Sequence, residues 1–221
     1  MLLAIDTATR SIGLALHSGE ELLAEHVWLT KGYHTVELAP EIALMLRRAD
    51  RQITDITAIA VAKGPGSYTG LRIGMALGKG LCLVHNLTIV AIPTFHIIAH
   101  GQPTRKEKLI AVIPAGRKRI AALWYKWGSR GWESKSEPEN TTWDELVSDL
   151  GEKTFICGEI EAQVRKMLEE EDLVILSSPA QSVRRPGMLA ELGWARIHLG
   201  EVDDAATLAP VYLQSQDSVL P

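Results

Sequence analysis

The chain has 221 residues, of which 46% are hydrophobic, and its formal net charge is -4. This length and apolar content allow a proper core, in one domain or in two small ones. The acidic balance argues against a dedicated nucleic-acid binder, which usually carries a basic face or stripe. No apolar run approaches membrane-spanning length and no secretory signal pattern opens the chain, so we expect a cytoplasmic protein without a membrane partner.

The first half of the chain predicts a mixed α/β unit. Residues 2–5, 12–16 and 21–28 have strand patterns, and Ser18-Gly19 lies in a hairpin-turn position, which indicates an antiparallel meander. A helix is predicted over about residues 35–49, followed by a strand over 56–62, a helix ending near 84 and a strand over 88–92. This order favours strand–helix–strand units added to the meander.

A glycine-rich turn, KGPGSYTGLRIG, joins the 56–62 strand to the next helix. Gly64 and Gly66 permit backbone angles that other residues avoid. The amides that follow, with the hydroxyls of Ser67 and Thr69, would lie at a helix N-terminus, where the helix dipole favours an anion such as phosphate. The alternative, which stays open, is that the glycines serve only the geometry of the turn. The turn is not a P-loop, because no Gly-Lys-Ser/Thr follows.

Gly70, Gly74 and Gly78 recur at helical spacing and leave a stripe without side chains. Each glycine inside a helix costs about 0.8–1.0 kcal/mol relative to alanine, so the stripe predicts a compensating close contact. The contact could be internal, with the sheet or the 35–49 helix, or could be made with another subunit.

The histidines are compatible with ordinary polar roles. His96 and His100 lie one helical turn apart and could share a metal ion, with Asp203 or Asp204 as a conceivable third ligand. No clear motif supplies that ligand, so no metal site is predicted. His34 opens the first long helix and is expected either to cap it or to contact a partner.

The second half repeats the strand order less clearly, with strands predicted over 109–113, 120–127, 155–157 and 173–176. We therefore predict two domains, 1–102 and 103–221, with the C-terminal segment packing back on the first. Thr142 and Glu145 have the spacing of a capping box at a helix start. Residues 128–140 are polar and broken by Gly and Pro, which indicates a loop. Cys82 and Cys157 lack metal-ligand or redox spacing and are interpreted as buried thiols.

The segment GPGSYTGLRIG resembles the hallmark segment of the bacterial YeaZ family, now called TsaB. The similarity extends from LLAIDTATRSIGLAL at the start, through residues 34–38, to the closing PVYL of residues 210–213. The resemblance implies an actin-like and Hsp70-like ATPase fold, also called ribonuclease-H-like, with two tandem α/β halves and mixed sheets.

The same resemblance implies a non-catalytic activating subunit. TsaB proteins bind their catalytic paralogue TsaD and act with TsaE in the transfer of threonylcarbamoyl to the adenosine next to the anticodon of tRNA. We expect a TsaD heterodimer, a homodimer when the chain is alone, and contact with tRNA only through the complex. The resemblance places the partner interface on two helices and assigns to it His34, Leu38, Gly70, Leu71, Gly74 and Gly78.

The resemblance also implies a candidate phosphate cleft, in which the turn after the first strand faces the glycine turn. Its residues would be Asp6, Thr7, Gly64, Gly66, Ser67 and Thr69, and ATP or ADP would bind there at a composite interface with the partner. The alternative is that Asp6 and Thr7 satisfy backbone donors in a tight turn. His96 and His100 align with a metal-binding His-x-x-x-His of TsaD and could be vestigial. The chain departs from its relatives at residues 114–118, where Pro-Ala-Gly-Arg-Lys replaces a frequent Asp-Ala-Arg.

The competing function is an independent enzyme, either a nucleotide-binding kinase or ATPase of the same superfamily or a metallopeptidase. A kinase should carry a further glycine-rich phosphate turn in its second half, where Cys157-Gly158-Glu159 is a weak match. A peptidase should carry a complete metal or nucleophile constellation. Neither requirement is met, and we predict no catalytic residue.

Overall fold

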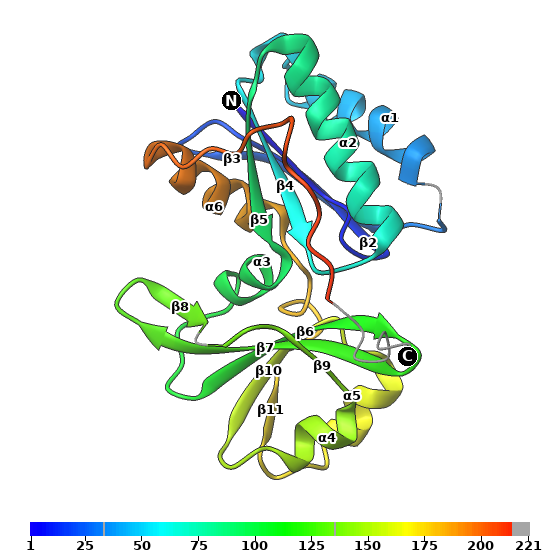
Figure 1. Cartoon of the computed structure of the whole chain (residues 1–221), viewed down its shortest axis with the longest axis vertical. Helices are drawn as coiled ribbons and strands as arrows, with labels where there is room; N and C mark the ends of the chain where they lie inside the picture. The colour runs from blue at the N-terminus through cyan, green and yellow to red at the C-terminus, as the bar shows by residue number, and fades with distance from the viewer. Residues whose placement is uncertain (33, 135, 214–221) are drawn as a thin grey trace, which may run out of the picture. The chain divides into compact units, whose positions relative to one another are not determined.

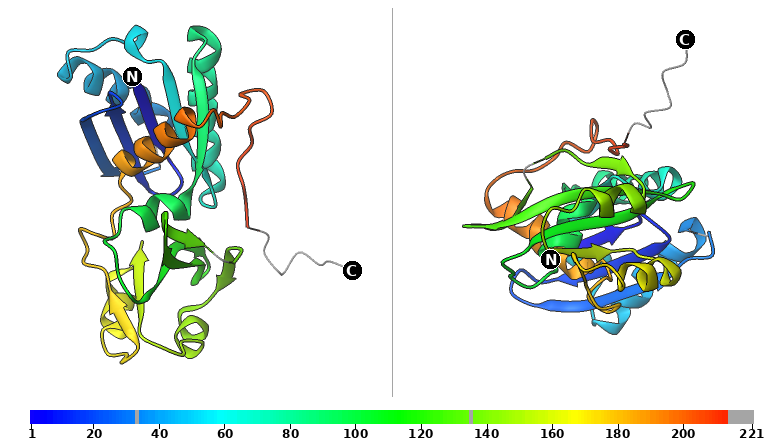
Figure 2. Two further views of the ribbon diagram at one scale, coloured as in Figure 1. Left: turned by 90° about the vertical axis from the view of Figure 1, so that its left-hand side faces the viewer. Right: turned by 90° about the horizontal axis from the view of Figure 1, so that it is seen from below.

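The computed structural model describes residues 1–32, 34–134 and 136–213. Their contacts divide the chain into two compact units (Figures 1 and 2). The first unit comprises Met1–Ile97 and Arg185–Val211, and the second is formed mainly by Ile98–Arg184. The contact boundary thus lies five residues before the predicted one at 102, and the chain enters the first unit twice.

The first unit contains a five-stranded sheet in the order β3-β2-β1-β4-β5. Its strands are β1 (Leu2–Asp6), β2 (Ser11–His17), β3 (Leu22–Leu29), β4 (Ala58–Gly64) and β5 (Thr88–Pro93). β2 is antiparallel to β1 and β3, which confirms the predicted meander, whereas β4 is parallel to both β1 and β5. β1 and β4 are buried over almost their whole length, as expected for near-continuous apolar strands in the middle of a covered sheet.

Helices cover both faces of this sheet (Figure 1). The helices α1 (His34–Arg48) and α2 (Tyr68–His85) contact each other and share one core cluster with large sheet residues such as Leu3, Leu14 and Ile59. α6 (Pro186–His198) packs on the opposite face against small residues, including Ala4 and Ala60. Two short elements complete the unit, the 3-10 turn η1 (Ile53–Asp55) and α3 (Thr94–His100), which crosses into the second unit.

A single carboxylate attaches the start of α6 to β3. Glu25 forms an ion pair with Arg185, and its Oε1 accepts a hydrogen bond of 2.8 Å from the amide of Gly187. The Glu25 side chain is only 14% exposed. Because the first amides of a helix have no partner within the helix, this carboxylate also serves as a cap for α6.

After α6 the chain runs along the edge of the sheet. The amide of Asp203 donates to the carbonyl of Ile89 at 2.9 Å, while its Oδ2 accepts hydrogen bonds from the amide of Ala91 and from Arg196. Further along, the amide of Val211 donates to the carbonyl of Lys63 at 2.8 Å. Residues 203–211, which we call the edge segment, therefore pack beside β5 and reach the end of β4.

The second unit repeats the sheet of the first. Its strands are β6 (Lys108–Gly116), β7 (Arg119–Gly128), β8 (Gly131–Ser134), β10 (Thr154–Gly158) and β11 (Val174–Leu176), in the order β11-β10-β6-β7-β8, with β9 (Glu139–Thr141) paired to β7. β6, β7 and β8 form an antiparallel meander, and β6, β10 and β11 are parallel. Both sheets have the same topology, in which the first strand of the meander, β1 or β6, is the central strand. This repeated order defines the actin-like, ribonuclease-H-like fold with two tandem α/β halves.

Two helices of the second unit, α4 (Trp143–Ser148) and α5 (Ala162–Leu168), are short. The predicted capping box at α4 is confirmed: the Thr142 side chain accepts from the Glu145 amide, and the Glu145 carboxylate accepts from the Thr142 amide at 2.9 Å. The Thr142 hydroxyl also donates to this carboxylate at 3.0 Å, and these two bonds to the carboxylate, first that of the amide and then that of the hydroxyl, hold the pKa of Glu145 below its ordinary value.

The loop predicted over residues 128–140 is wrong, because β8 and most of β9 lie within it. Trp132 provides the physical reason. Trp132 is 3% exposed. Its ring packs edge-on against that of Trp127, with the ring centroids 5.3 Å apart, and its Nε1 donates to the carbonyl of Gln102. Burial of one large side chain thus outweighs a local composition typical of turns.

Candidate functional site

The turn after β1 packs directly on the glycine turn that precedes α2. The Ser67 amide donates to the carbonyl of Ala8 at 2.6 Å, and the Thr7 hydroxyl donates to the carbonyl of Gly70 at 2.7 Å. Asp6 is 1% exposed, and its Oδ1 accepts from the amide of Ala8 at 3.0 Å. The polar groups of the two turns therefore bond within the chain.

The glycines of this region are explained by the closeness of that packing. A Cβ atom at Gly66 would lie 2.2 Å from the carbonyl oxygen of Ala8, and one at Gly70 would lie 2.2 Å from that of Thr7. At Gly74 the added atom would lie 2.2 Å from the Thr7 hydroxyl oxygen. The contact that compensates for the glycine stripe is thus internal.

Gly64 has a different requirement. Its φ is +110°, in the region that favours glycine, and a Cβ would lie 2.2 Å from the carbonyl oxygen of Val211 in the edge segment. Gly78 ends the stripe, with Val61 of β4 at 2.9 Å from the position of its Cβ. The missing side chain at Gly64 lets the backbone approach the edge segment, and the missing side chain at Gly78 lets α2 approach β4.

These contacts bear on the predicted phosphate cleft, which stays a prediction. The turn after β1 and the glycine turn touch at Thr7 and Gly70. The geometric alternative for the glycines and for the β1 turn is the one that the contacts support. Ser67 and Thr69 are exposed at the start of α2, where the Ser67 hydroxyl accepts a hydrogen bond from the Gly70 amide at 3.2 Å.

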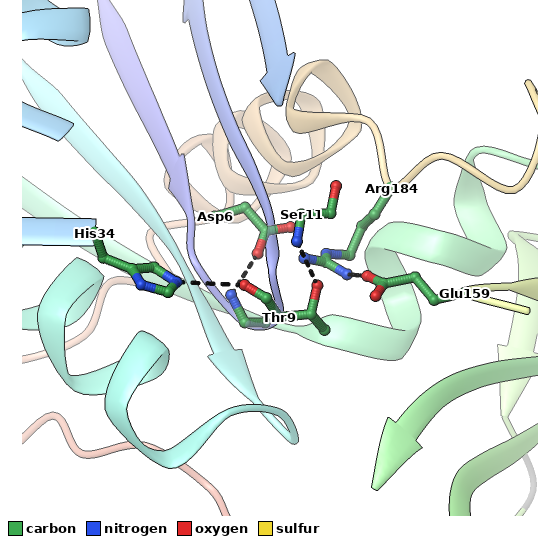
Figure 3. A network of polar contacts seen from close by, with 7 residues as sticks. Asp6, Thr9, Ser11, His34, Glu159 and Arg184 are labelled. Carbon is green, nitrogen blue, oxygen red and sulfur yellow. Dashed lines mark hydrogen bonds and ion pairs between the residues drawn. The ribbon is translucent and has the colours of Figure 1, made fainter. Parts of the chain in front are cut away.

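The six residues assigned to a partner interface face the interior of the unit. His34 is 8% exposed and its Nε2 lies 3.5 Å from the carbonyl oxygen of Thr9 (Figure 3). Leu38 is 1% exposed and Leu71 is fully buried. Gly70, Gly74 and Gly78 are buried as well. These residues pack α1 and α2 onto the sheet, and their assignment to an interface stays a prediction. The surface left open to a partner is the other side of the same helices.

That other side is exposed and largely apolar, with the exposed Arg47 and Arg72 one helical turn from Ala43 and Ala76. We call it the outer helix face, and its residues are Val36, Ala39, Pro40 and Ala43 on α1 with Ala76, Gly80, Leu83 and Val84 on α2. Val36 is 69% exposed, Leu83 86% and Val84 75%. A Cβ at Gly80 would meet nothing within 4 Å, so internal packing does not explain this glycine. Exposed apolar side chains that recur at helical spacing are typical of interaction surfaces.

Polar contacts hold α1 in place beneath this face. The Trp28 indole donates to Glu37 Oε2 at 2.8 Å, and His26 Nδ1 lies 3.3 Å from Glu41 Oε2. The rings of His26 and Trp28 stack with their centroids 4.8 Å apart. Both carboxylates belong to α1 and both rings to β3. These contacts therefore attach α1, and with it the α1 part of the outer helix face, to the sheet.

The candidate metal ligands do not come together. Among the residues described, no group of three or more His, Cys, Asp or Glu side chains lies close enough to hold an ion. Asp203, the conceivable third ligand beside His96 and His100, instead accepts from the Ala91 amide and from Arg196. Burial raises the pKa of the Cys82 thiol to about 11 and also raises that of Cys157, which favours the neutral thiols.

In the part of the chain that the structure describes, no helix combines the length and the apolar character needed to cross a bilayer.

Comparison with known proteins agrees with this architecture. The family model described as "TsaD: tRNA N6-adenosine threonylcarbamoyltransferase" matches residues 28–182, well over half of the chain. A Bacillus subtilis strain 168 protein named "tRNA threonylcarbamoyladenosine biosynthesis protein TsaB" is 28% identical over 96% of this chain and 93% of its own length. The protein of the same name from Escherichia coli K12 is 33% identical over 64% of this chain and 58% of its own.

Among solved structures, YeaZ from Pseudomonas aeruginosa superposes with a TM-score of 0.77 at 23% identity, covering 96% of this chain and 99% of that one. The fold and the family model together define a protein of the TsaD-related class with an actin-like fold. Within that class, the chain belongs to the TsaB (YeaZ) family.

Proposed function

We propose that the chain is a non-catalytic scaffold subunit in tRNA threonylcarbamoyladenosine biosynthesis. It binds TsaD through the outer helix face, acts with TsaE in the cytoplasm, and reaches tRNA through that complex. The observation that carries the proposal is the exposed apolar stripe on two helices whose opposite sides are fully used by the core.

The chemistry of the outer helix face favours another pair of helices as the partner. Ala76 and Gly80 leave no long side chain along the middle of α2, which lets a second helix approach closely. The flanking Leu83 and Val84 offer apolar side chains for burial. A TsaD chain shares the family to which this sequence matches and would present an equivalent helix pair. In its absence, two copies of this chain would pair through the same face about a twofold axis.

The test places a charge in the middle of the outer helix face. Ala76→Glu would bury a carboxylate in an apolar contact, which should weaken TsaD binding by about a hundredfold or more. Ala195→Glu makes the same change at an exposed position of α6, on the opposite face of the sheet, and should bind TsaD like the wild type. Size exclusion with light scattering reports the heterodimer, and circular dichroism reports that both variants fold.

The proposal is wrong if Ala76→Glu retains full TsaD binding. The glycine stripe is not a suitable site for this test, because a larger side chain at Gly74 would disturb the fold itself. ATP or ADP at a composite contact with TsaD stays a prediction, to which this chain would contribute the exposed Ser67 and Thr69.

A further inference from the structure

The second unit contains a hollow of about 540 Å³ that the proposed scaffold role does not use. Three segments line it: the β6–β7 turn at Gly116–Arg119, the start of α4 at Thr142–Asp144, and the stretch from Glu159 into α5. It lies beyond the carboxyl ends of the parallel strands β6 and β10, which is where open α/β sheets bind their ligands. Its volume is that of a small-molecule site.

The β6–β7 turn places cations on the rim of this hollow. Gly116 pairs with Arg119, so Arg117 and Lys118 are the two central residues of the hairpin turn. Their φ angles are +49° and +63°, in the left-handed region where hairpins of this kind normally have Asn-Gly. Two long cationic side chains at strained positions indicate a functional reason, and their charge fits an anionic group. The same turn overlaps the segment where the chain departs from the Asp-Ala-Arg of its relatives.

The acidic residues in the lining have a different chemistry. Glu159 is ion-paired with Arg184, whose side chain is 1% exposed, so this carboxylate is fixed and its charge is compensated (Figure 3). Asp144 and Glu161, which also line the hollow, are exposed. Carboxylates repel a polyanion but accept hydrogen bonds from hydroxyl and amino groups. The hollow therefore fits a ligand with one anionic end and several hydrogen-bond donors.

The rest of the lining is largely apolar and includes one aromatic ring. Trp143 is half-buried, and Ile120, Val164 and Met167 line the hollow beside it. An indole ring among apolar lining residues suits a planar ring that can stack on it. A single anion, a polyol and a planar ring are the three parts of a nucleotide.

We propose that this hollow binds a nucleoside monophosphate unit. The phosphate contacts Arg117 and Lys118, the base packs against Trp143, and the hydroxyl or amino groups donate to Asp144 and Glu161. The unit could be a free mononucleotide or one unpaired nucleotide of an RNA chain, since both present the same groups. The site belongs to the second unit alone and is independent of the outer helix face.

Isothermal titration calorimetry of the full chain with AMP tests the proposal. The double variant Arg117→Asn with Lys118→Gly removes both cations and installs the preferred turn residues. It should lower AMP affinity by about tenfold or more, while its melting temperature rises because the turn is relaxed. The control, Lys126→Asn with Arg130→Gly, removes equal charge from exposed positions of the same unit that do not line the hollow and should bind AMP like the wild type.

Lys118→Glu is a second variant that keeps the turn and reverses one charge, and it should also weaken AMP binding. A short single-stranded oligoadenylate distinguishes the two sources of the ligand. Binding tighter than that of AMP, and lost in the double variant, indicates an RNA nucleotide, whereas equal or weaker binding indicates the free nucleotide. Absence of saturable AMP binding, or equal affinity of the wild type and both turn variants, overturns the proposal.

Discussion

Two glycines on the same helix should respond to the same substitution with opposite signs. Gly74 and Gly80 both lie inside α2, and alanine has a higher helix propensity than glycine at each of them. At Gly80 the new methyl group meets nothing within 4 Å, so Gly80→Ala should raise the free energy of unfolding by about 0.5–1 kcal/mol.

At Gly74 the methyl group would lie 2.2 Å from the Thr7 hydroxyl oxygen, and Thr7 is 2% exposed. Moving Thr7 away breaks its 2.7 Å hydrogen bond to the Gly70 carbonyl, at about 1–3 kcal/mol for a buried group left without its partner. Overpacking adds about 1–3 kcal/mol. After subtraction of about 1 kcal/mol for helix propensity, Gly74→Ala should lower the free energy of unfolding by about 1–5 kcal/mol.

Urea denaturation followed by circular dichroism measures both changes. The experiment is run at low protein concentration, so that self-association through the outer helix face does not stabilise either variant. A stable Gly74→Ala variant would refute the internal explanation of the glycine stripe. A destabilised Gly80→Ala variant would refute the exposed position of that residue.

Three further outcomes are expected. Gly64→Ala should lower the melting temperature by an amount equivalent to about 1–3 kcal/mol, because its φ of +110° and the nearby Val211 carbonyl both oppose a side chain; an unchanged melting temperature would contradict this. Glu25→Gln should lower the urea midpoint by the equivalent of about 1–2 kcal/mol through loss of the charge paired with Arg185, and an unchanged midpoint would show that the pair contributes little. Burial raises the pKa of Cys82 from 9.0 to about 11, so the stability that it contributes is present below pH 9 and is lost as the pH rises towards 11; thermal melts over this window should fall less steeply for Cys82→Ala than for the wild type.

The sequence predicted most of the strands and the first two long helices because their signals are local. The first three strands, α1 and the end of α2 lie within one or two residues of their predicted bounds, whereas α6 was not predicted. The capping box at Thr142 is equally local, since both partners lie within one turn. The family was recognisable for the same reason, from a short run of residues around the glycine turn.

Which side of α1 and α2 faces the core could not be predicted in the same way. Helical spacing shows that Gly70 and Gly74 need a close neighbour, but it does not show which surface supplies it. The neighbour is Thr7, more than sixty residues earlier in the chain. The outer helix face had a signal that was available, namely Val36, Ala39 and Ala43 at helical spacing, although only burial distinguishes such a stripe from a core-facing one.

The edge segment also protects the protein from strand pairing with other molecules. β5 is the last strand of the first sheet, and an open strand edge invites addition of a strand from another molecule. Asp203 occupies that edge twice, with its amide on the Ile89 carbonyl and its carboxylate on the Ala91 amide. A chain cut before residue 203 would keep all five strands but would expose these groups, and aggregation of the shortened protein would be the visible result.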